Sequence, residues 1–170
     1  VHIEIPLDLM DASAPDTAKT IEHVKKQPEG IEKANTLLSN SHSPLILAGG
    51  GCRRSPIALQ SLAERLGAPV ILTANARGLM HGHPLAIAAS PSLEPLRELI
   101  RSADRLLVLG SELGPTDYDM YGDGGFPDTT AMIRVDTDAV QLARHPAALT
   151  LHGDAAEIPP QLTPPPPAAE

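Results

Sequence analysis

The sequence predicts an α/β fold: a doubly wound, mainly parallel six-stranded sheet in the order 3-2-1-4-5-6, Rossmann-like, with helices on both faces. Short apolar runs alternate with amphipathic stretches along most of the chain. The runs are apolar at nearly every position, which is typical of parallel strands buried on both faces. Glycine-rich turns, "AGGG" and "LGSELG", follow two of the runs, as expected for tight turns where strands end.

Six apolar runs are the expected strands. Most of them are bounded by glycine, proline or polar residues, which interrupt regular structure. With right-handed crossovers, the first three strands extend to one side of the sheet and the last three to the other. The expected strands are residues 44–48, 69–73, 85–89, 105–109, 131–135 and 148–151.

Four amphipathic stretches between the strands are the expected helices, over residues 28–41, 55–66, 92–102 and 138–144. In the second of them, Ser55 is the expected N-cap and Pro56 lies in the first turn, where proline is well tolerated. Apolar residues at helical spacing are expected to face the sheet. They are Ile31, Ala34, Leu37 and Leu38 in the first helix, and Ile57, Leu59, Leu62, Ala63 and Leu66 in the second.

The ends of the chain differ in composition from this central unit, which we place at residues 28–156. Residues 1–27 begin with an apparent strand, "VHIEIPLDL", and continue as a polar connector. Residues 157–170 are rich in proline, a composition typical of an extended linker. Because the chain opens on Val1 inside an apparent strand, we expect it to be a segment of a longer protein.

Composition narrows the classes of partner. The 170 residues include 21 acidic and 13 basic side chains, so the protein is expected to bind neither nucleic acid nor an anionic membrane surface. No apolar run approaches the roughly 20 residues of a membrane-spanning helix. With a single cysteine in the sequence, a reducing, cytoplasmic setting is expected.

The turn Gly49-Gly50-Gly51 follows the first strand and has two interpretations. Adjacent glycines allow a phosphate to approach the backbone at the start of a helix, and the turn at Gly110, after the fourth strand, would face the same crevice. The turn lacks the G-x-G-x-x-G spacing, and no acidic residue ends the second strand. A purely structural tight turn is therefore slightly favoured over a dinucleotide site.

Three further residues have a chemical and a simpler interpretation. His81 and His83 would offer two imidazoles to a metal, but a stable site needs three or four ligands, and a surface loop is favoured. Cys52 stands beside Arg53, yet no histidine or second cysteine accompanies it, so we expect a small turn residue. No catalytic or metal-binding role is assigned to any residue of the chain.

The segment 111–130 is long for a loop without regular structure, and such loops are usually functional or mobile. It holds four aspartates, and both tyrosines and the one phenylalanine of the chain. The aspartates lack the spacing of a calcium-binding loop. A solvated excursion is one interpretation; the other is a docking or cation-recognition loop, in which Asp117 and Asp119 select the substrate. The four aspartates are Asp117, Asp119, Asp123 and Asp128.

Several stretches together resemble a known family. "VHIEIPLDLM", "SPLILAGGG", "LAERLGAPVILTANARGLMHGHPLA", "ADRLLVLGSELGPTDYDMYGDGGFP" and "IRVDTD" are similar to the central domain of thiamine-diphosphate-dependent enzymes of the acetolactate synthase type. The loop is closest to the 5-guanidino-2-oxopentanoate decarboxylase branch. Residues 1–27 resemble the end of the preceding pyrimidine-binding domain and its linker, and residues 157–170 the linker to the pyrophosphate-binding domain.

The resemblance implies a 2-oxo acid decarboxylase or carboligase whose thiamine diphosphate and Mg²⁺ are bound outside this segment. In these families a glutamate of the preceding domain activates the cofactor, and a GDG…N motif of the following domain holds the metal. The "GDG" at Gly122-Asp123-Gly124 has no such asparagine after it. The implied partners are the flanking domains, in a homodimer or homotetramer, and the segment alone is expected to be inactive.

The resemblance also implies a nucleotide crevice, because this domain holds FAD in acetolactate synthases. The matching positions here are Gly49, Gly50, Gly51, Gly110, Asp136 and Asp138. Residues 111–114 replace the arginine-bearing segment of flavin-binding members, so we expect the fold to be retained without FAD. Two alternatives remain open: a stand-alone FAD- or NAD-binding module, and a deacetylase-like NAD domain with the same strand order.

Overall fold

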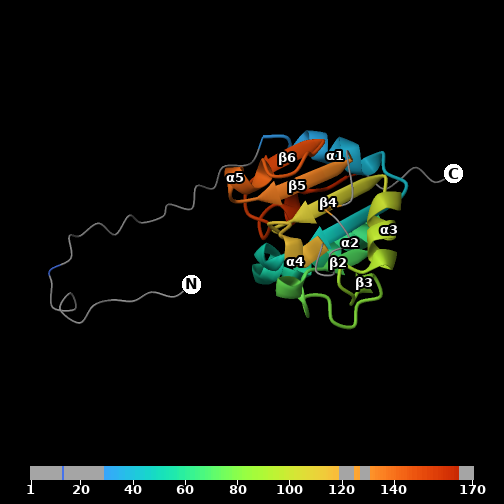
Figure 1. The fold of residues 1–170 in the computed structure, drawn as a ribbon. Helices are drawn as coiled ribbons and strands as arrows, with labels where there is room; N and C mark the ends of the chain where they lie inside the picture. The colour runs from blue at the N-terminus through green and yellow to red at the C-terminus, as the bar shows by residue number, and fades with distance from the viewer. Residues whose placement is uncertain (1–12, 14–28, 119–124, 127–130, 165–170) are drawn as a thin grey trace.

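The computed structural model describes residues 13, 29–118, 125–126 and 131–164. A six-stranded parallel sheet runs through them in the order β3-β2-β1-β4-β5-β6 (Figure 1), which confirms the predicted fold. Each observed strand falls within one residue of its expected run or inside it. The strands are β1 (Pro44–Ala48), β2 (Val70–Leu72), β3 (Ala86–Ile87), β4 (Arg105–Leu109), β5 (Met132–Asp136) and β6 (Leu149–His152).

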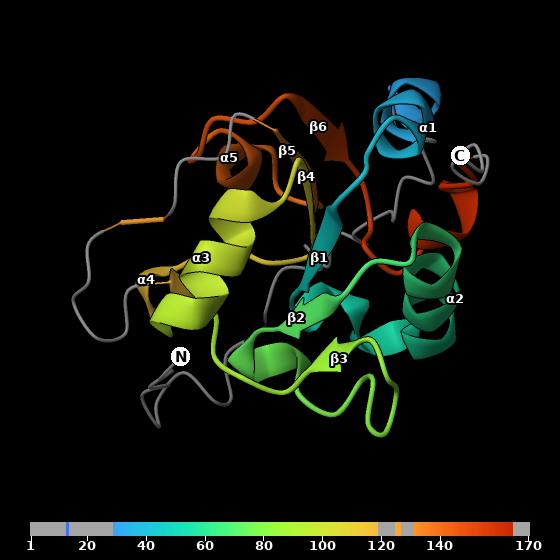
Figure 2. The ribbon, with the colours of Figure 1, turned by 90° about the vertical axis from the view of Figure 1, so that its right-hand side faces the viewer.

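Helices cover both faces of the sheet, as Figure 2 shows: α1 and α2 lie on one face, and α3, α4 and α5 lie on the other. Four of the helices correspond to expected ones, whereas α4 lies in the segment expected to be a loop. Short 3-10 helices follow β1 and β2 and end the described chain. The helices are α1 (Ile31–Ser39), η2 (Gly50–Arg54), α2 (Pro56–Leu66), η3 (Ala74–Ala76), α3 (Glu94–Ser102), α4 (Pro115–Tyr118), α5 (Ala139–Leu142) and η4 (Pro159–Gln161).

The core consists of two apolar clusters, one on each side of the sheet. Successive side chains of a strand point to opposite faces, so Ile46 joins the cluster with α1 and α2, while Leu45 and Leu47 join the cluster with α3. The strands therefore have to be apolar at every position. This double burial is why the sequence shows continuous apolar runs rather than alternation.

The α2 helix confirms most of its expected pattern. Pro56 occupies the first turn, and Gly67 ends the helix in the left-handed conformation at φ 59°, which glycine adopts without strain. Ser55 stands at the N-cap, but its side chain makes no capping hydrogen bond. The inward placement of Ile57 was wrong: this side chain is 76% exposed. It precedes buried Leu59 by two residues, a spacing that puts side chains on opposite sides of a helix.

The globular unit extends past the expected boundary at residue 156. Ile158 and Leu162 are buried in the cluster with α1 and α2, so residues 158–162 are not an extended linker. Arg65 of α2 donates hydrogen bonds to the carbonyls of Pro159 (3.3 Å) and Leu162 (3.0 Å). Two apolar residues four apart bury one face of η4, and proline is compatible with its first turn. The expected pyrimidine-domain end and most of its linker, with residues 165–170, lie outside the described residues.

None of the helices in the described part of the chain has the length and apolar character needed to span a membrane.

Asp104 fixes the turn that leads into β1. Its carboxylate accepts hydrogen bonds from the Ser41 hydroxyl and from the backbone N–H groups of His42 (2.7 Å) and Ser43 (3.1 Å). Burial alone would raise the pKa of Asp104, but these hydrogen bonds outweigh it, and the pKa lies below its ordinary value of 3.8. The charged carboxylate therefore stabilises the folded state.

We expect Asp104→Asn to lower the free energy of unfolding by about 1–2 kcal/mol at neutral pH, discounted for partial exposure. Because the folded pKa is depressed, this stabilisation is complete above the unfolded value of 3.8 and is lost as the pH falls below it. Urea unfolding at neutral and acidic pH measures the difference. Glu157→Gln, at an exposed site, is the control. A gap between wild type and Asp104→Asn that stays constant down to strongly acidic pH would contradict the role of the charge.

Candidate functional site

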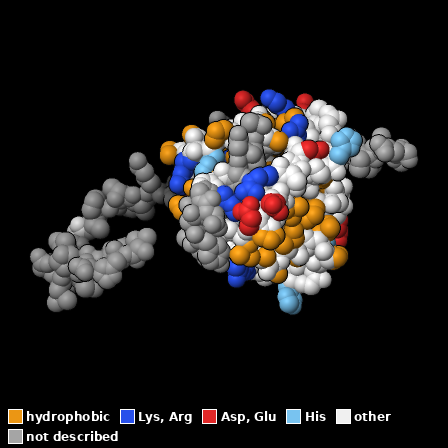
Figure 3. Space-filling model, turned by 45° about the vertical axis from the view of Figure 1, so that its right-hand side comes forward, with side chains coloured by type: hydrophobic (Ala, Val, Ile, Leu, Met, Phe, Trp, Pro, Cys, Tyr) orange, Lys and Arg blue, Asp and Glu red, His pale blue; other side chains and the backbone are white. Residues whose placement is uncertain are grey.

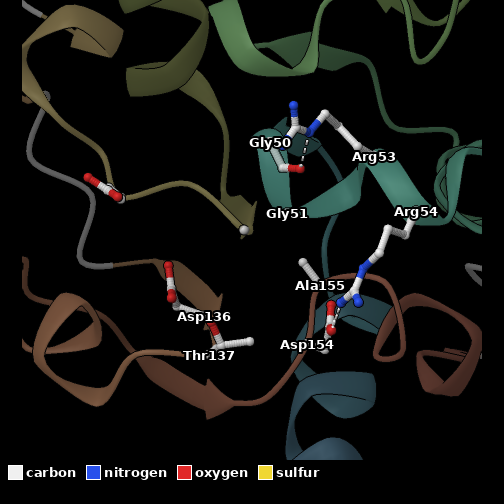
Figure 4. Close-up of a pocket in the computed structure, with 10 residues that line it drawn as sticks. Gly50, Gly51, Arg53, Arg54, Asp136, Thr137, Asp154 and Ala155 are labelled. Atoms are coloured by element: carbon white, nitrogen blue, oxygen red, sulfur yellow. Dashed lines mark hydrogen bonds and ion pairs between the residues drawn. The ribbon is translucent and has the colours of Figure 1, made fainter. Parts of the chain in front are cut away.

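A solvent-open crevice of about 390 Å³ lies at the carboxyl ends of β1, β4 and β5 (Figure 4). This is the point where the strand order reverses, and ligands of open α/β sheets bind at such points. The structure thus brings the two glycine turns and the end of β5 together, as the sequence predicted. The lining residues are Gly50, Gly51, Arg53, Arg54, Gly110, Glu112, Asp136, Thr137, Asp154 and Ala155.

The two glycine turns pack directly against each other. The N–H of Gly49 donates to Leu109 O (2.8 Å), and the N–H of Gly51 donates to Gly110 O (3.0 Å). A Cβ on Gly49 would overlap the Gly110 carbonyl, and a Cβ on Gly51 would lie 2.9 Å from Gly110 Cα. Gly110 also has a positive φ of 58°. Close backbone approach therefore accounts for glycine at positions 49, 51 and 110 without a ligand.

The charges of the crevice are mostly used within the protein. Arg54 forms an ion pair with Asp154, and Arg53 Nε donates to Gly50 O at 3.2 Å (Figure 4). Glu112 and Asp136 add two further carboxylates to the lining. A diphosphate placed here would meet three carboxylates, two arginines that already bind Asp154 and Gly50 O, and the N–H of Gly51, which is bonded to Gly110 O. This donor set does not fit the diphosphate of FAD.

Asp136 and Asp138 are brought together but have different surroundings. Asp136 lines the crevice, and its Oδ1 accepts a hydrogen bond from the N–H of Asp138 at 2.9 Å. Asp138 is the N-cap of α5, because its Oδ1 accepts from the N–H of Val140 at 2.8 Å. Asp138 does not line the crevice, and this cap is a structural use of its carboxylate.

Asp117 lies in the short helix α4, which follows the Gly110 turn in the chain. The Ser111 hydroxyl donates to Asp117 Oδ2 at 3.0 Å, and the N–H of Leu113 donates to Ser111 Oγ at 3.1 Å. Burial, together with the nearby charge of Glu112, raises the pKa of Asp117 above its ordinary value, although the Ser111 hydrogen bond opposes this. Asp119, Asp123 and Asp128 lie outside the described residues.

Cys52 and the two loop histidines fit their simpler interpretations. Burial raises the pKa of the Cys52 thiol to about 12, which is opposite to an activated thiolate, and its Sγ lies 3.5 Å from Leu109 O. His83 Nε2 lies 3.2 Å from a Glu64 carboxylate oxygen, while His81 is exposed. Within the described part of the chain, no three metal-binding side chains gather.

Sequence reasoning missed two buried arginines, Arg97 of α3 and Arg134 of β5, which are 3% and 1% exposed. Both occupy buried positions, Arg97 on the amphipathic helix α3 and Arg134 in the mostly apolar strand β5. Both donate to carbonyls of the segment after β4. The sequence signal for them was an arginine at a position that the pattern assigns to the buried face. Charged residues are rarely buried unless they are paired, so such an arginine indicates a specific partner. An aromatic group was also missed, in which the rings of Tyr118, Phe126 and His145 lie 5.7–5.9 Å apart.

Comparison with known proteins identifies the family. The family model "Thiamine pyrophosphate enzyme, central domain" matches residues 31–162. The chain belongs to this family. A "Probable 2-ketoarginine decarboxylase" of Pseudomonas aeruginosa is 34% identical over 164 residues, covering 91% of this chain and 28% of that protein. The large subunit of acetolactate synthase isozyme 1 of Escherichia coli is 26% identical, covering 85% of this chain and 27% of the subunit.

Solved structures share the fold of this central domain. A benzoylformate decarboxylase from Polynucleobacter necessarius superposes with a TM-score of 0.68 at 23% identity, covering 88% of this chain and 29% of that one. A thiamine diphosphate-dependent 4-hydroxybenzoylformate decarboxylase of Rhodococcus jostii gives a TM-score of 0.63 at 22% identity, with 82% and 29% covered. The chain spans less than a third of the length of these relatives.

The packing of the turns predicts that Gly49→Ala will destabilise the protein by about 3 kcal/mol, because the new methyl group meets backbone that cannot move aside like a side chain. Gly114→Ala is the matched control: a Cβ there has open space around it, so a change within about 0.5 kcal/mol is expected. Chemical denaturation of the two variants makes the comparison. Equal stabilities would show that the two turns are not tightly packed.

Proposed function

We propose that this chain is the central domain of a thiamine-diphosphate-dependent decarboxylase whose 2-oxo acid substrate carries a guanidinium group. The proposal is carried by the 34% identity, over 91% of the chain, to a protein described as a probable 2-ketoarginine decarboxylase. The similarity to an acetolactate synthase subunit is lower, at 26%. Decarboxylation releases C1 of the 2-oxo acid as carbon dioxide. A proton then takes the place of the carboxylate on C2, which becomes the aldehyde carbon of the product.

Within the whole protein, the cofactor and Mg²⁺ belong to the flanking domains. The described residues hold no cluster of three metal-binding side chains, and the donor set of the crevice does not fit a diphosphate. When bound, thiamine diphosphate supplies the electron sink for loss of carbon dioxide. The central domain contributes the loops at the carboxyl edge of its sheet and contacts the flanking domains of the same chain. The whole protein is proposed to be a cytoplasmic homodimer or homotetramer.

The acidic segment supplies a chemical reason for a cationic substrate. Burial and the charge of Glu112 both disfavour the ionised form of Asp117, so an approaching cation relieves both effects. A guanidinium also fits a carboxylate through two parallel charge-assisted hydrogen bonds. Asp119, two residues further on, would add a second carboxylate to the same segment. The two aspartates are therefore the proposed contacts for the guanidinium end of the substrate.

This assignment predicts that the full-length enzyme releases carbon dioxide from 2-ketoarginine, which is 5-guanidino-2-oxopentanoate. Asp117→Asn and Asp119→Asn are expected to raise KM for this substrate by about tenfold, the loss of one charge-assisted contact, with a smaller change for pyruvate. Glu98→Gln, at an exposed position of α3, should change neither value. Equal effects on both substrates would remove the aspartates from substrate choice. Acetolactate as the main product from pyruvate would favour a carboligase instead.

The crevice leads to a second prediction, about flavin. Because its two arginines bind Asp154 and Gly50 O, and the N–H groups of Gly51 and Gly110 are bonded within the protein, we expect the purified full-length enzyme to be colourless and to retain no FAD. Visible absorbance and analysis of released cofactor measure this directly. A yellow protein with flavin in a one-to-one ratio would contradict the prediction and show that the enzyme binds flavin.

A further inference from the structure

Arg97 connects α3 to the acidic segment. Its guanidinium donates one hydrogen bond to the carbonyl of Tyr118, the last residue of α4, and another to the carbonyl of Gly125 (2.9 Å). Its Nε lies 3.5 Å from a carboxylate oxygen of Glu94. The side chain is 3% exposed, and α3 and α4 lie on the same face of the sheet (Figure 2). One buried cation therefore holds two points of the segment 111–130.

Arg134 holds the beginning of the same segment from the other side. Its guanidinium, on β5, donates to Ser111 O at 3.3 Å and to Gln141 O at 2.7 Å. Ser111 in turn donates its hydroxyl to Asp117. Asp117 is thus placed between two anchors: Ser111, whose carbonyl Arg134 binds, and the end of α4, which Arg97 binds. The helix itself has four residues, too short to be stable without such contacts.

Burying a guanidinium stabilises a core less efficiently than burying an apolar side chain. Removing an ion from water carries a penalty of several kcal/mol, and apolar residues of similar volume often stabilise a protein equally well. What Arg97 adds over an apolar side chain is direction: its fork of donors fixes the carbonyls that it binds.

We infer that Arg97 is a positioning residue for substrate selection, which fixes the end of α4 and thereby holds the Asp117 carboxylate where a cationic substrate meets it. The inference rests on the proposed function for its substrate, and on the hydrogen bonds of Arg97 for its geometry. Arg97 touches no reacting atom. It acts through Asp117, so its loss should weaken recognition of the charged substrate more than it slows the chemical step.

The same helix offers a matched control. Arg101 is exposed, and its guanidinium lies 2.8 Å from Glu94 Oε1. Figure 3, which brings the α3 side of the molecule forward, shows acidic and basic side chains together on the surface. Arg101→Met removes a cation from α3 without touching α4. Arg97→Met removes the anchor, and Arg97→Lys keeps the charge but not the fork of donors.

The test uses the full-length holoenzyme and measures kcat and KM with 2-ketoarginine and with pyruvate. Arg97→Met is expected to raise KM for 2-ketoarginine by about tenfold and to change kcat, and KM for pyruvate, by less than about twofold. Arg97→Lys should recover part of the loss, and Arg101→Met should match wild type. Equal increases for both substrates, or wild-type constants in Arg97→Met, would overturn the inference.

Hydrogen–deuterium exchange on the same variants separates this inference from the proposed function. Exchange in residues 111–118 should rise in Arg97→Met and stay at the wild-type level in Arg101→Met. A rise spread over the whole domain, or none in 111–118, would overturn the anchoring role. If wild type fails to decarboxylate 2-ketoarginine, the proposed function is wrong and the exchange result alone decides whether Arg97 positions α4.

Discussion

The turns that follow β1 and β4 pack backbone against backbone at the carboxyl edge of the sheet. This contact sets the course of the two loops that continue from these strands. Gly49 and Gly51 touch Gly110 at distances that leave no room for a side chain. From this contact the two loops diverge. Cys52 enters the apolar cluster beneath α2, whereas Leu113 enters the cluster beneath α3. The crevice and the acidic segment therefore meet at one shared backbone contact, and Glu112, near the start of the segment, lines the crevice.

The two sides use charge in different ways. On the crevice side, Arg54 remains exposed and pairs with Asp154, an arrangement of small energetic value because water screens it. On the side of the acidic segment, Arg97 and Arg134 are buried and bind backbone carbonyls. Removing Arg134 would leave the buried carbonyl of Ser111 without this partner, and the penalty for an unsatisfied buried group exceeds what the bond itself contributes. The backbone around Asp117 is therefore bound by buried donors, whereas the arginine pair of the crevice is open to solvent.

The sheet was predictable because its signal is local. Strands buried on both faces must be apolar throughout, and β1 and β4 were predicted at their observed bounds. Local sequence patterns gave wrong predictions at the end of a helix and where contacts between residues far apart in the sequence determine the structure. Ile57 lies in the first turn of α2, away from the buried face. Residues 158–162 pack on the domain through buried Ile158 and Leu162, and Arg65, far away in the sequence, binds two of their carbonyls.

The candidate site was less predictable than the fold. The sequence placed the glycines and Asp136 at one crevice, but the reason for glycine there is an approach between two backbones that no periodicity reports. Arg97 is equally invisible, because its partners lie 21 and 28 residues away in the chain. Asp117 was identified from composition alone. Its link to Ser111, and through Ser111 to Arg134, is a property of the folded chain.

The shared framework limits where substrate choice can reside. Proteins described as decarboxylases of benzoylformate and 4-hydroxybenzoylformate have this domain fold at 22–23% identity, and a fold common to several activities does not specify any one of them. Strand order and glycine packing belong to that framework. The connections between strands are where such proteins are free to differ. In this chain the connection from β4 to β5 is the long acidic one, and two buried arginines bind backbone carbonyls at three of its described residues, Ser111, Tyr118 and Gly125. The proposed selection of a cationic substrate is therefore assigned to that connection, because its geometry is specific to this chain rather than to the shared framework.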